Sequence, residues 1–398
     1  MSGLGKAIIK VIGVGGSGCN AITHMASKEV LGVQFISINT DAQALSNDVD
    51  SHKIQIGDSI TKGLGAGADP EIGRMAAESD IEMIIDNVKD ADMVFITCGM
   101  GGGTGTGAAP VIAKAVKELG ILTVAVVTKP FGIEGNKRMK NAESGLLELK
   151  DHVDAILVIP NEKLSKVFGG KTNLFSAFEK ANQVLHNAVQ GISEIITQEG
   201  FINVDFNDVK TVMKESGTSM MGMGISSHDG EEKAEEAARL AIECPLLEES
   251  NLSGAKGLII NVASDGNINL DDFTVIGEIV KEIADPDATI IMGTSMDNDL
   301  NGAIKVTIIA TGLISNPKTN LTASSGLYSD LLNNLKTKKT VTQLKEIEVK
   351  EDTTLEKNIN IEEEEDISIQ ADIKVRTKEN KIESLLPAFL KNKMIDKK

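Results

Sequence analysis

The sequence of 398 residues has no tryptophan, one tyrosine and eight prolines, and its three cysteines are far apart. Cys19, Cys98 and Cys244 have neither the spacing of a zinc site nor the even number expected of a disulfide framework. The first ten residues lack the succession of basic, apolar and small residues of a secretory signal. These absences predict a protein of the reducing cytoplasm.

Positive charge is scarce, since 40 Lys and Arg stand against 58 Asp and Glu and the formal net charge is −18. Phosphate backbones and anionic lipid surfaces require clustered Lys and Arg, so we predict no nucleic-acid partner. The longest uncharged run, residues 93–113, contains six glycines and Pro110, which favours strand, loop and helix start over a membrane helix. We therefore predict no direct membrane insertion.

The last fifth of the chain differs in composition from the rest. No glycine occurs after Gly326, and residues 317–398 carry 15 basic and 15 acidic residues, so the whole net charge belongs to residues 1–316. Too few large apolar side chains are present to offset the chain entropy by burial, which predicts disorder over residues 316–380. The apolar stretch from Leu385 to Leu390 is more typical of a docking peptide on a tether than of a core segment.

Apolar β-branched runs alternate with helical patterns over residues 1–160, which predicts a doubly wound, mostly parallel α/β sheet. Strands are expected at 8–14, 33–38, 93–97, 122–127 and 155–159, and helices near 20–28, 70–88, 108–119 and 135–149. The pattern over 173–198 is apolar on more than one face and predicts a buried central helix. A smaller α+β region is expected to follow, with helices at 231–242 and 271–283 and strands at 257–262, 289–292 and 305–310.

These patterns divide the chain into five expected segments. We predict a nucleotide-binding domain, a central helix, a C-terminal α+β domain, a disordered linker and a docking tail, at residues 1–172, 173–199, 200–315, 316–380 and 381–398.

Residues 13–18 match G-x-G-x-x-G between a predicted strand and helix. Glycine there allows backbone amides to approach a phosphate at a helix N-terminus. Asp41 follows at the distance where NAD enzymes have a ribose-binding acid, so this loop alone leaves a dinucleotide enzyme, or simply a tight turn, open.

The second loop, residues 99–107, has six glycines and two threonines in nine residues. We expect a helix to begin after it at Ala108, with Pro110 in the first turn. So many free N–H groups and hydroxyls favour a polyphosphate site over a flexible surface loop. A third loop, residues 63–70, is expected to cover the same edge of the sheet. No G-x-x-x-x-G-K-S/T pattern occurs, so amide dipoles and Mg²⁺, rather than a P-loop lysine, would hold the phosphates.

Residues 101–107, Gly-Gly-Gly-Thr-Gly-Thr-Gly, resemble the signature of the tubulin superfamily. Within it, the chain from Ala7 to Gly312 and the tail segment from Leu386 to Leu390 are similar to the FtsZ family of bacterial division GTPases. The likeness rests on several motifs in the same order, namely 39–45, 63–67, Lys129-Pro-Phe131 with Glu134 and Arg138, and 203–208.

The resemblance implies a self-polymerising GTPase that binds GTP or GDP with Mg²⁺ and forms the division ring at midcell, on the inner face of the plasma membrane. It also implies membrane-tethering division proteins as partners of the tail. The nucleotide contacts that it implies are with Gly16, Ser17, Gly18, Cys19 and Asn20 for phosphate and guanine, Gly103, Thr104 and Gly105 for the β- and γ-phosphates, Glu134 and Arg138 for ribose and phosphate, and Phe178 and Asn182 for the base.

Asp205 and Asp208 begin a predicted helix, where they could simply form a cap and an acidic first turn. The resemblance implies that both, with Asn203, orient the attacking water and help to hold a cation. In the family this loop lies opposite the nucleotide, so head-to-tail stacking would complete the active site from two subunits.

Gln183 occupies a position where some family members have an aspartate that contacts guanine. A neutral amide is a weaker acceptor than a carboxylate, so we hypothesise a weaker preference for GTP over ATP. An NAD-dependent oxidoreductase is the alternative from another class, but it leaves residues 101–107 unused and offers no catalytic His or Tyr. A nucleotide-binding regulator without catalysis would need Asp205 and Asp208 to be caps only.

The tail gives the first testable prediction. Leu386, Phe389 and Leu390 fall on one side of a short helix, and so short a helix is stable only against a partner. Phe389→Ala should therefore abolish retention of membrane-tethering division proteins in a pull-down, while GTP hydrolysis and filament sedimentation stay unchanged. Equal retention of partners by both proteins would contradict the docking role. Loss of sedimentation would instead assign the tail to the polymer.

Overall fold

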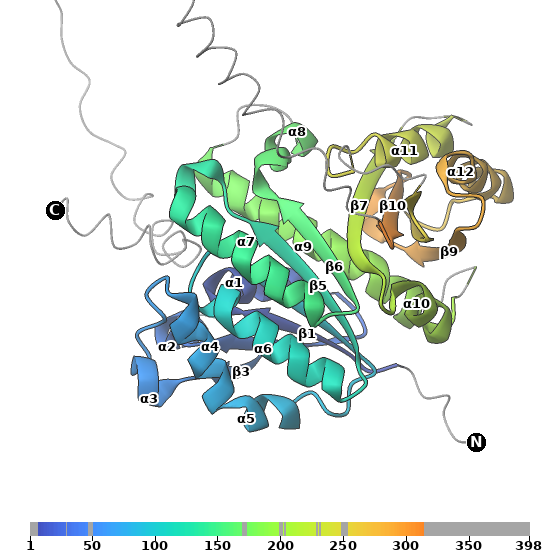
Figure 1. Ribbon diagram of the computed structural model, residues 1–398. Helices are drawn as coiled ribbons and strands as arrows, with labels where there is room; N and C mark the ends of the chain where they lie inside the picture. The colour runs from blue at the N-terminus through green and yellow to red at the C-terminus, as the bar shows by residue number, and fades with distance from the viewer. Residues whose placement is uncertain are drawn as a thin grey trace, which may run out of the picture. The chain divides into compact units, whose positions relative to one another are not determined.

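The computed structural model describes residues 7–28, 30–46, 51–168, 173–198, 202, 204–227, 230, 232–247 and 254–313, which all fall in one compact unit (Figure 1). The predictions for the linker at 316–380, for the tail at 381–398 and for Asn203 lie outside these residues.

A ten-stranded sheet in the order β3-β2-β1-β4-β5-β6-β7-β10-β8-β9 forms the centre of the unit. The neighbours from β3 to β6 are all parallel, which confirms the predicted doubly wound, mostly parallel sheet. The strands are β1 (Ile9–Val14), β2 (Val33–Asn39), β3 (His52–Gln55), β4 (Met93–Gly99), β5 (Leu122–Lys129), β6 (Ala155–Pro160), β7 (Gly217–Ser226), β8 (Gly257–Ser264), β9 (Thr289–Met296) and β10 (Ile304–Thr311).

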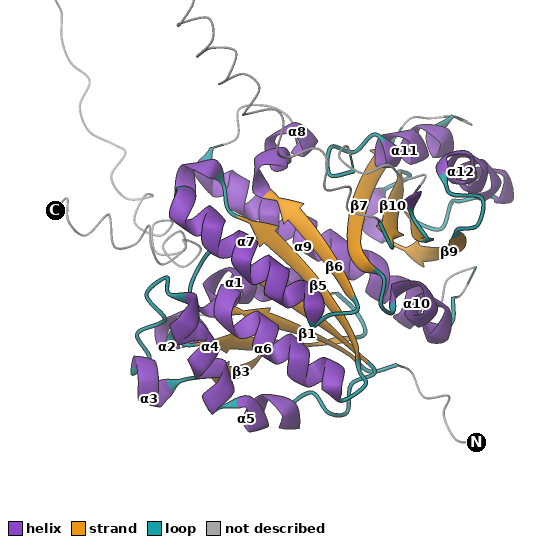
Figure 2. Ribbon diagram, viewed as in Figure 1, coloured by secondary structure: helices purple, strands orange, loops and turns teal. Residues whose placement is uncertain are grey.

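The helices cover both faces of the sheet (Figure 2). They are α1 (Gly15–Ser27), α2 (Ala42–Ser46), α3 (Asp58–Thr61), α4 (Pro70–Ser79), α5 (Ile81–Asp86), α6 (Thr104–Glu118), α7 (Asn136–Asp151), α8 (Leu164–Phe168), α9 (Leu174–Thr197), α10 (Phe206–Met213), α11 (Lys233–Ile242) and α12 (Leu270–Ile283). The 3₁₀ turns are Gly132–Glu134, Asn161–Lys163 and Asn298–Leu300.

Three predicted helices differ from the structure in their bounds, and the first, α1, begins at Gly15 rather than near residue 20, because the first glycine loop forms its first turn. The helix expected at 70–88 is divided into α4 and α5 at Asp80, because the backbone of Asp80 is not helical. Its carboxylate accepts a hydrogen bond of 2.6 Å from Gly57 N–H. The helix expected from Ala108 begins at Thr104, so the glycine loop itself forms its first turn and Pro110 lies in its interior. The helix therefore starts closer to the edge of the sheet than the proline suggested.

Strand β7 joins the two halves of the sheet, and its sequence did not predict a strand. Its first three residues pair in parallel with β6, and residues 220–226 pair antiparallel with β10. Gly222 and Gly224 occur where α11 crosses the strand, because a Cβ at either position would overlap a backbone carbonyl oxygen of that helix. Close helix packing thus requires glycine within a buried strand.

Successive residues of the parallel strands face two separate cores. In β4, Met93 and Phe95 belong to one cluster with α1, α9 and α10, whereas Val94 and Ile96 belong to another with α4, α6 and α7. This period of two is expected of strands buried on both faces. A third cluster packs α11 and α12 against β8 and β10.

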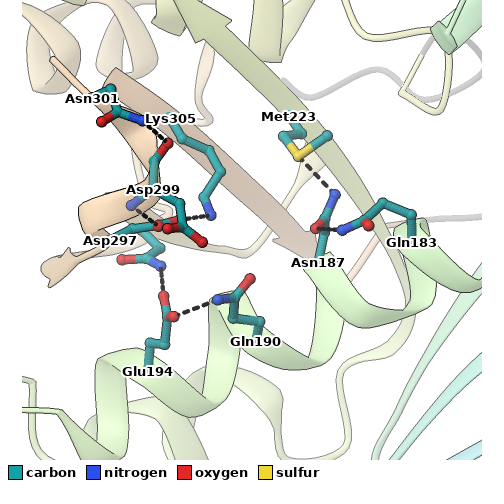
Figure 3. A network of polar contacts seen from close by, with 10 residues as sticks. Gln183, Asn187, Gln190, Glu194, Met223, Asp297, Asp299, Asn301 and Lys305 are labelled. Atoms are coloured by element: carbon teal, nitrogen blue, oxygen red, sulfur yellow. Dashed lines mark hydrogen bonds and ion pairs between the residues drawn. The ribbon is translucent and has the colours of Figure 1, made fainter. Parts of the chain in front are cut away.

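Helix α9 is buried as predicted, but it is not apolar all round. Its apolar side belongs to one core cluster with residues of β1, β4, β5 and β6 and also of β7, β8 and β10. Polar side chains follow another side, at Gln183, Asn187, Gln190 and Glu194 (Figure 3). Glu194 accepts hydrogen bonds from Gln190 Nε2 (2.7 Å) and Asn261 Nδ2 (3.2 Å), and burial raises its pKa. The helix therefore contacts the C-terminal strands partly through hydrogen bonds.

Two glycines allow α4 and α6 to cross closely, next to the second glycine loop. A Cβ at Gly107 would overlap the carbonyl oxygen of Pro70, and a Cβ at Gly73 would lie 2.5 Å from Gly103 O. We predict that Gly107→Ala lowers the free energy of unfolding by about 1–3 kcal/mol through overpacking, despite the better helix propensity of alanine. Thermal unfolding by circular dichroism measures this change.

Gly254→Ala is the matched control. Gly254 has an ordinary φ, and a Cβ there meets no atom within 4 Å, so stability should change little. An unfolding free energy for Gly107→Ala equal to that of the control would mean that the helices do not need this close contact.

Candidate functional site

Two helices begin side by side where the order of the sheet reverses, between β1 and β4. Helix α1 starts at Gly15, immediately after β1, and α6 starts at Thr104 after β4. The two helices pack on opposite faces of the sheet. Gly15 has φ +72°, and a Cβ there would lie 2.9 Å from Gly105 N, so the two loops touch. Open α/β sheets bind ligands at such a point.

The electrostatics of this edge favour an anion. The first N–H groups of α1 and α6 have no carbonyl partner within their own helix, and both helix dipoles end here. Neither helix has an acidic residue in its first turn. Amide groups of two helices can therefore hold phosphate without a lysine.

A pocket opens beside these two helix starts. It is lined by Ser17, Asn20, Gly99, Met100, Gly102, Thr128, Pro130, Glu134, Arg138, Asn161, Phe178, Ala181, Asn182 and Leu185. The six predicted residues Ser17, Asn20, Glu134, Arg138, Phe178 and Asn182 are thus brought together from α1, α7, α9 and the turn before α7.

Glu134 and Arg138 form an ion pair on one wall of the pocket, with Nη1 and Oε2 3.1 Å apart. The Glu134 side chain is only 8% exposed, and its other oxygen accepts a hydrogen bond of 2.9 Å from Phe131 N–H. The Phe131 ring in turn meets the Phe178 ring edge to face at 5.4 Å. A fixed carboxylate, a guanidinium and an aromatic face are therefore held in one rigid group.

Asn161 is a lining residue that the sequence analysis missed. It follows β6 directly, its side chain is buried, and its Oδ1 has no hydrogen-bond partner among the described residues. A buried amide oxygen without a partner costs free energy unless a water or ligand donates to it. Thr128 and Pro130, also missed, end β5 in the same way. Their place at the C-terminal ends of parallel strands was the available signal.

Other predicted residues support the phosphate edge from below rather than lining the pocket. Gly18 lies where a Cβ would be 2.5 Å from Thr97 O, so it allows α1 to pack closely on β4. Cys19 is buried, with Sγ directed at Gly13 O and Ile38 O, so only its backbone can face a ligand. Thr104 Oγ1 shares a hydrogen bond of 2.7 Å with Thr40 Oγ1.

The third loop covers this edge, as expected. A Cβ at Gly103 would lie 2.8 Å from Ala66 Cβ and 3.0 Å from Asp69 N, so the loops at 63–70 and 99–107 are in contact. Gly65 N–H donates to Thr40 O at 3.2 Å. Gly16, by contrast, has no atom within 4 Å of its Cβ position and an ordinary φ, so contacts of the protein do not require glycine there.

Asp41 and Gln183 have structural partners in place of the ligand contacts considered for them. The Asp41 carboxylate accepts hydrogen bonds from the N–H groups of Gln43 (2.9 Å) and Ala44 (3.1 Å) and caps α2, which removes the ribose-binding acid of the NAD alternative. Gln183 does not line the pocket, and its amide bonds to His24 and Asn187. The weaker preference for GTP over ATP that was hypothesised for Gln183 stays a prediction.

Asp205 and Asp208 lie at the opposite end of α9 from the pocket, at the start of α10 (Figure 1). The fifteen steps from Asn182 to Thr197 alone rise about 22 Å along the helix axis. Both carboxylates are exposed, and that of Asp205 makes no capping hydrogen bond to described residues. The acids therefore cannot reach the pocket of their own chain. The missing hydrogen bond also weakens the interpretation of Asp205 as a simple helix cap.

Among the described residues, no group of three or more His, Cys, Asp or Glu side chains could hold a metal ion. Nor is any helix in the same ranges long and apolar enough to cross a bilayer.

Comparison with known proteins agrees with this geometry. The model of the Tubulin/FtsZ family, GTPase domain, matches residues 8–169, and that of the FtsZ family, C-terminal domain, matches residues 217–314. The cell division protein FtsZ of Buchnera aphidicola subsp. Baizongia pistaciae is 54% identical over 329 residues, 83% of this chain and 82% of that protein. The chain belongs to the FtsZ family. It is a tubulin-like GTPase of cell division and binds GTP and GDP.

A further relative and two solved structures extend the comparison. The cell division protein FtsZ of Pseudomonas aeruginosa is 53% identical over 307 residues, 77% of each chain. An empty FtsZ dimer of M. jannaschii has a TM-score of 0.75 at 46% identity and covers 78% of this chain and 89% of its own. CetZ2 of Haloferax volcanii, at 19% identity and a TM-score of 0.66, shares the fold; it covers 84% of this chain and 100% of its own.

Substitution of Gly102 tests whether the nucleotide contacts this edge of the pocket directly. It lines the pocket, has an ordinary φ, and its Cβ position has no atom within 4 Å. Gly102→Ala should therefore change the free energy of unfolding by less than about 0.5 kcal/mol. It should nevertheless weaken GDP binding about tenfold, because the methyl group takes space at the pocket. Isothermal titration of GDP measures the affinity, with Gly254→Ala as the control, and an unchanged affinity would show that the ligand does not approach Gly102.

Proposed function

We propose that GTP binds with its phosphates at the N-termini of α1 and α6 and its base between α1 and α9. The phosphate edge offers the free N–H groups of two helices, that of Thr104 included, and the hydroxyl of Ser17. Gly16, Gly18, Cys19, Gly103 and Gly105 contribute backbone amides there. The convergence of two helix starts at one edge supports this orientation of the triphosphate.

The other end of the pocket suits a purine nucleoside. Asn20, Asn161 and Asn182 supply amide donors and acceptors from three different elements, and Phe178 supplies an aromatic face. Glu134 would accept from ribose and Arg138 would donate to phosphate, and their ion pair on one wall of the pocket supports these roles.

We further propose that hydrolysis takes place in a composite site between two copies of the chain. The observation that carries this proposal is the separation of Asp205 and Asp208 from the pocket along α9. Head-to-tail stacking would bring these acids and Asn203 of one copy to the γ-phosphate of the next. A heterologous contact of this kind does not close, so it generates a filament.

In such a site the chain mainly positions groups. Asp205 and Asp208 would orient the attacking water and polarise it, while the amides of α1 and α6 stabilise charge on the phosphate oxygens. Because the acids come from the neighbouring copy, hydrolysis depends on assembly. Removal of the γ-phosphate would weaken the contact and allow subunits to leave.

Mg²⁺ would neutralise charge on the phosphates. The phosphate edge supplies hydroxyls and N–H groups rather than carboxylates, which fits an ion held mainly by phosphate oxygens and water. Asp205 and Asp208 of the neighbouring copy could add ligands to it.

At the level of the cell, we propose that filaments assemble into the division ring at midcell, in the cytoplasm. The segment from Leu385 to Leu390 would bind membrane-tethering division proteins and so hold the ring at the inner face of the plasma membrane. The five segments at 1–172, 173–199, 200–315, 316–380 and 381–398 correspond to nucleotide binding, connection, activation of the neighbour, spacing and docking.

Replacement of Asp208 tests the composite site. We expect Asp208→Ala to bind GTP and to form filaments but to hydrolyse GTP at least about tenfold more slowly, because a water-positioning group is lost. Glu82→Ala removes an exposed carboxylate from the first turn of α5 and should keep the wild-type rate. Phosphate release, GDP binding and sedimentation are measured on all three proteins.

Dilution provides the companion measurement. The wild-type rate per protomer should rise with concentration above a threshold, since each site needs two copies. A rate that is constant on dilution, or a normal rate for Asp208→Ala, would contradict the composite site and leave Asp208 as a residue of the first helical turn.

A further inference from the structure

Helices α1 and α9 form opposite walls of the base end of the pocket, and one hydrogen bond joins them directly. His24 Nε2–H donates to Gln183 Oε1 at 3.1 Å. His24 follows Asn20 by one helical turn on α1, and Gln183 is adjacent to Asn182 on α9. Because residues four apart share a helix face, this bond lies about one turn, or roughly 5 Å, beyond the lining residue Asn20.

The Gln183 amide is held from both ends, which fixes its orientation. Its oxygen accepts from His24, and its Nε2 donates to Asn187 Oδ1 at 2.8 Å. Asn187 Nδ2 is in turn directed at Met223 Sδ of β7, at 3.1 Å (Figure 3). Reversal of the Gln183 amide would place its oxygen against Asn187 Oδ1, an acceptor facing an acceptor, so the contact with Asn187 keeps the Gln183 oxygen directed at His24.

The His24 ring is also fixed. It meets the ring of His186 edge to face, with centroids 5.8 Å apart. Burial lowers the pKa of His24 more than the Gln183 hydrogen bond and Glu179 raise it, and Lys28 lowers it further. Burial, with His24 and Lys305 nearby, lowers the pKa of His186 to about 4. Both rings are therefore neutral at pH 7, and the Gln183 oxygen selects the His24 tautomer with the proton on Nε2.

We propose that His24 and Gln183 form a latch between α1 and α9 that positions Asn20 and Asn182 against the purine base. The inference rests on the proposed binding of GTP in this pocket. A recognition site discriminates only if its polar groups are held within about 0.5 Å of the required geometry, and these two amides come from different helices. The latch fixes the separation of those helices next to the base, so His24 and Gln183 are positioning residues for purine specificity.

The ratio of ATP to GTP dissociation constants separates this role from a structural one. Full-length His24→Phe removes the donor but keeps a ring against His186, and Gln183→Leu removes the acceptor at similar volume. Each should lower the ratio about tenfold, and the double variant should lower it no further, because either change already breaks the bond. His24→Gln retains an N–H donor and should restore most of the ratio. Gln34→Leu, the same substitution at an exposed position of β2, should leave it unchanged.

Competition of GTP and ATP against a fluorescent GDP analogue gives these ratios. Equal weakening of both nucleotides, with the ratio unchanged, would overturn the positioning role, as would unaltered affinities. A wild-type protein without preference for GTP would overturn the proposed function as well.

A titration of His24 without nucleotide tests the hydrogen bond of the latch directly and does not depend on nucleotide binding. In Gln183→Glu the carboxylate would accept from His24 and pair with its charged form, so the His24 pKa measured by NMR should rise relative to wild type. If the pKa does not rise, the two side chains are not in contact and the proposal fails, whatever the nucleotide ratios.

Discussion

The structure depends on the place where the helix N-termini of α1 and α6 meet, between β1 and β4. Two sets of backbone amides without helical partners have to be satisfied at one edge of the sheet, and a single anion would do this for both. Gly15, Gly18 and Gly105 allow the helices and strands to approach closely enough. The glycines of α4 and α6 then bring the loop at 63–70 over the same edge. An acidic chain can hold polyphosphate here because the positive potential comes from oriented dipoles and not from net charge.

A second constraint acts along the length of the molecule. The sheet continues without interruption through β7, and α9 packs on strands of both halves. The same helix that lines the pocket therefore also sets the distance to the acids at the start of α10. In the composite site that we propose, this separation would prevent a single copy from completing its own catalytic site, and hydrolysis would depend on assembly.

The polar side of α9 contacts the C-terminal strands through hydrogen bonds, unlike an ordinary apolar core. Hydrogen bonds at Gln183, Asn187, Gln190 and Glu194 are directional, whereas apolar contacts are not. The buried Glu194, with its raised pKa, has two amide donors but no cation bonded to it among the described residues. Such a network specifies one arrangement of the helix against the C-terminal strands, and through His24 it reaches the pocket.

The sequence by itself determined the parallel sheet, the two phosphate loops and the buried central helix. The apolar runs of the strands, the spacing of the glycines and the helical periodicity are local properties of the sequence, and they do not depend on the rest of the chain. It also selected Ser17, Asn20, Glu134, Arg138, Phe178 and Asn182, which the structure brings to one pocket, though there the resemblance to the FtsZ family contributed as much as the chemistry. Only the tertiary structure showed that Asn161 and Thr128 line the pocket, that the Cys19 side chain points into the core and that Gln183 forms a hydrogen bond with His24. It also made a strand of the glycine-rich β7. In each case the deciding neighbour comes from a distant part of the chain, and a side chain's partner depends on which elements pack together rather than on its own local pattern.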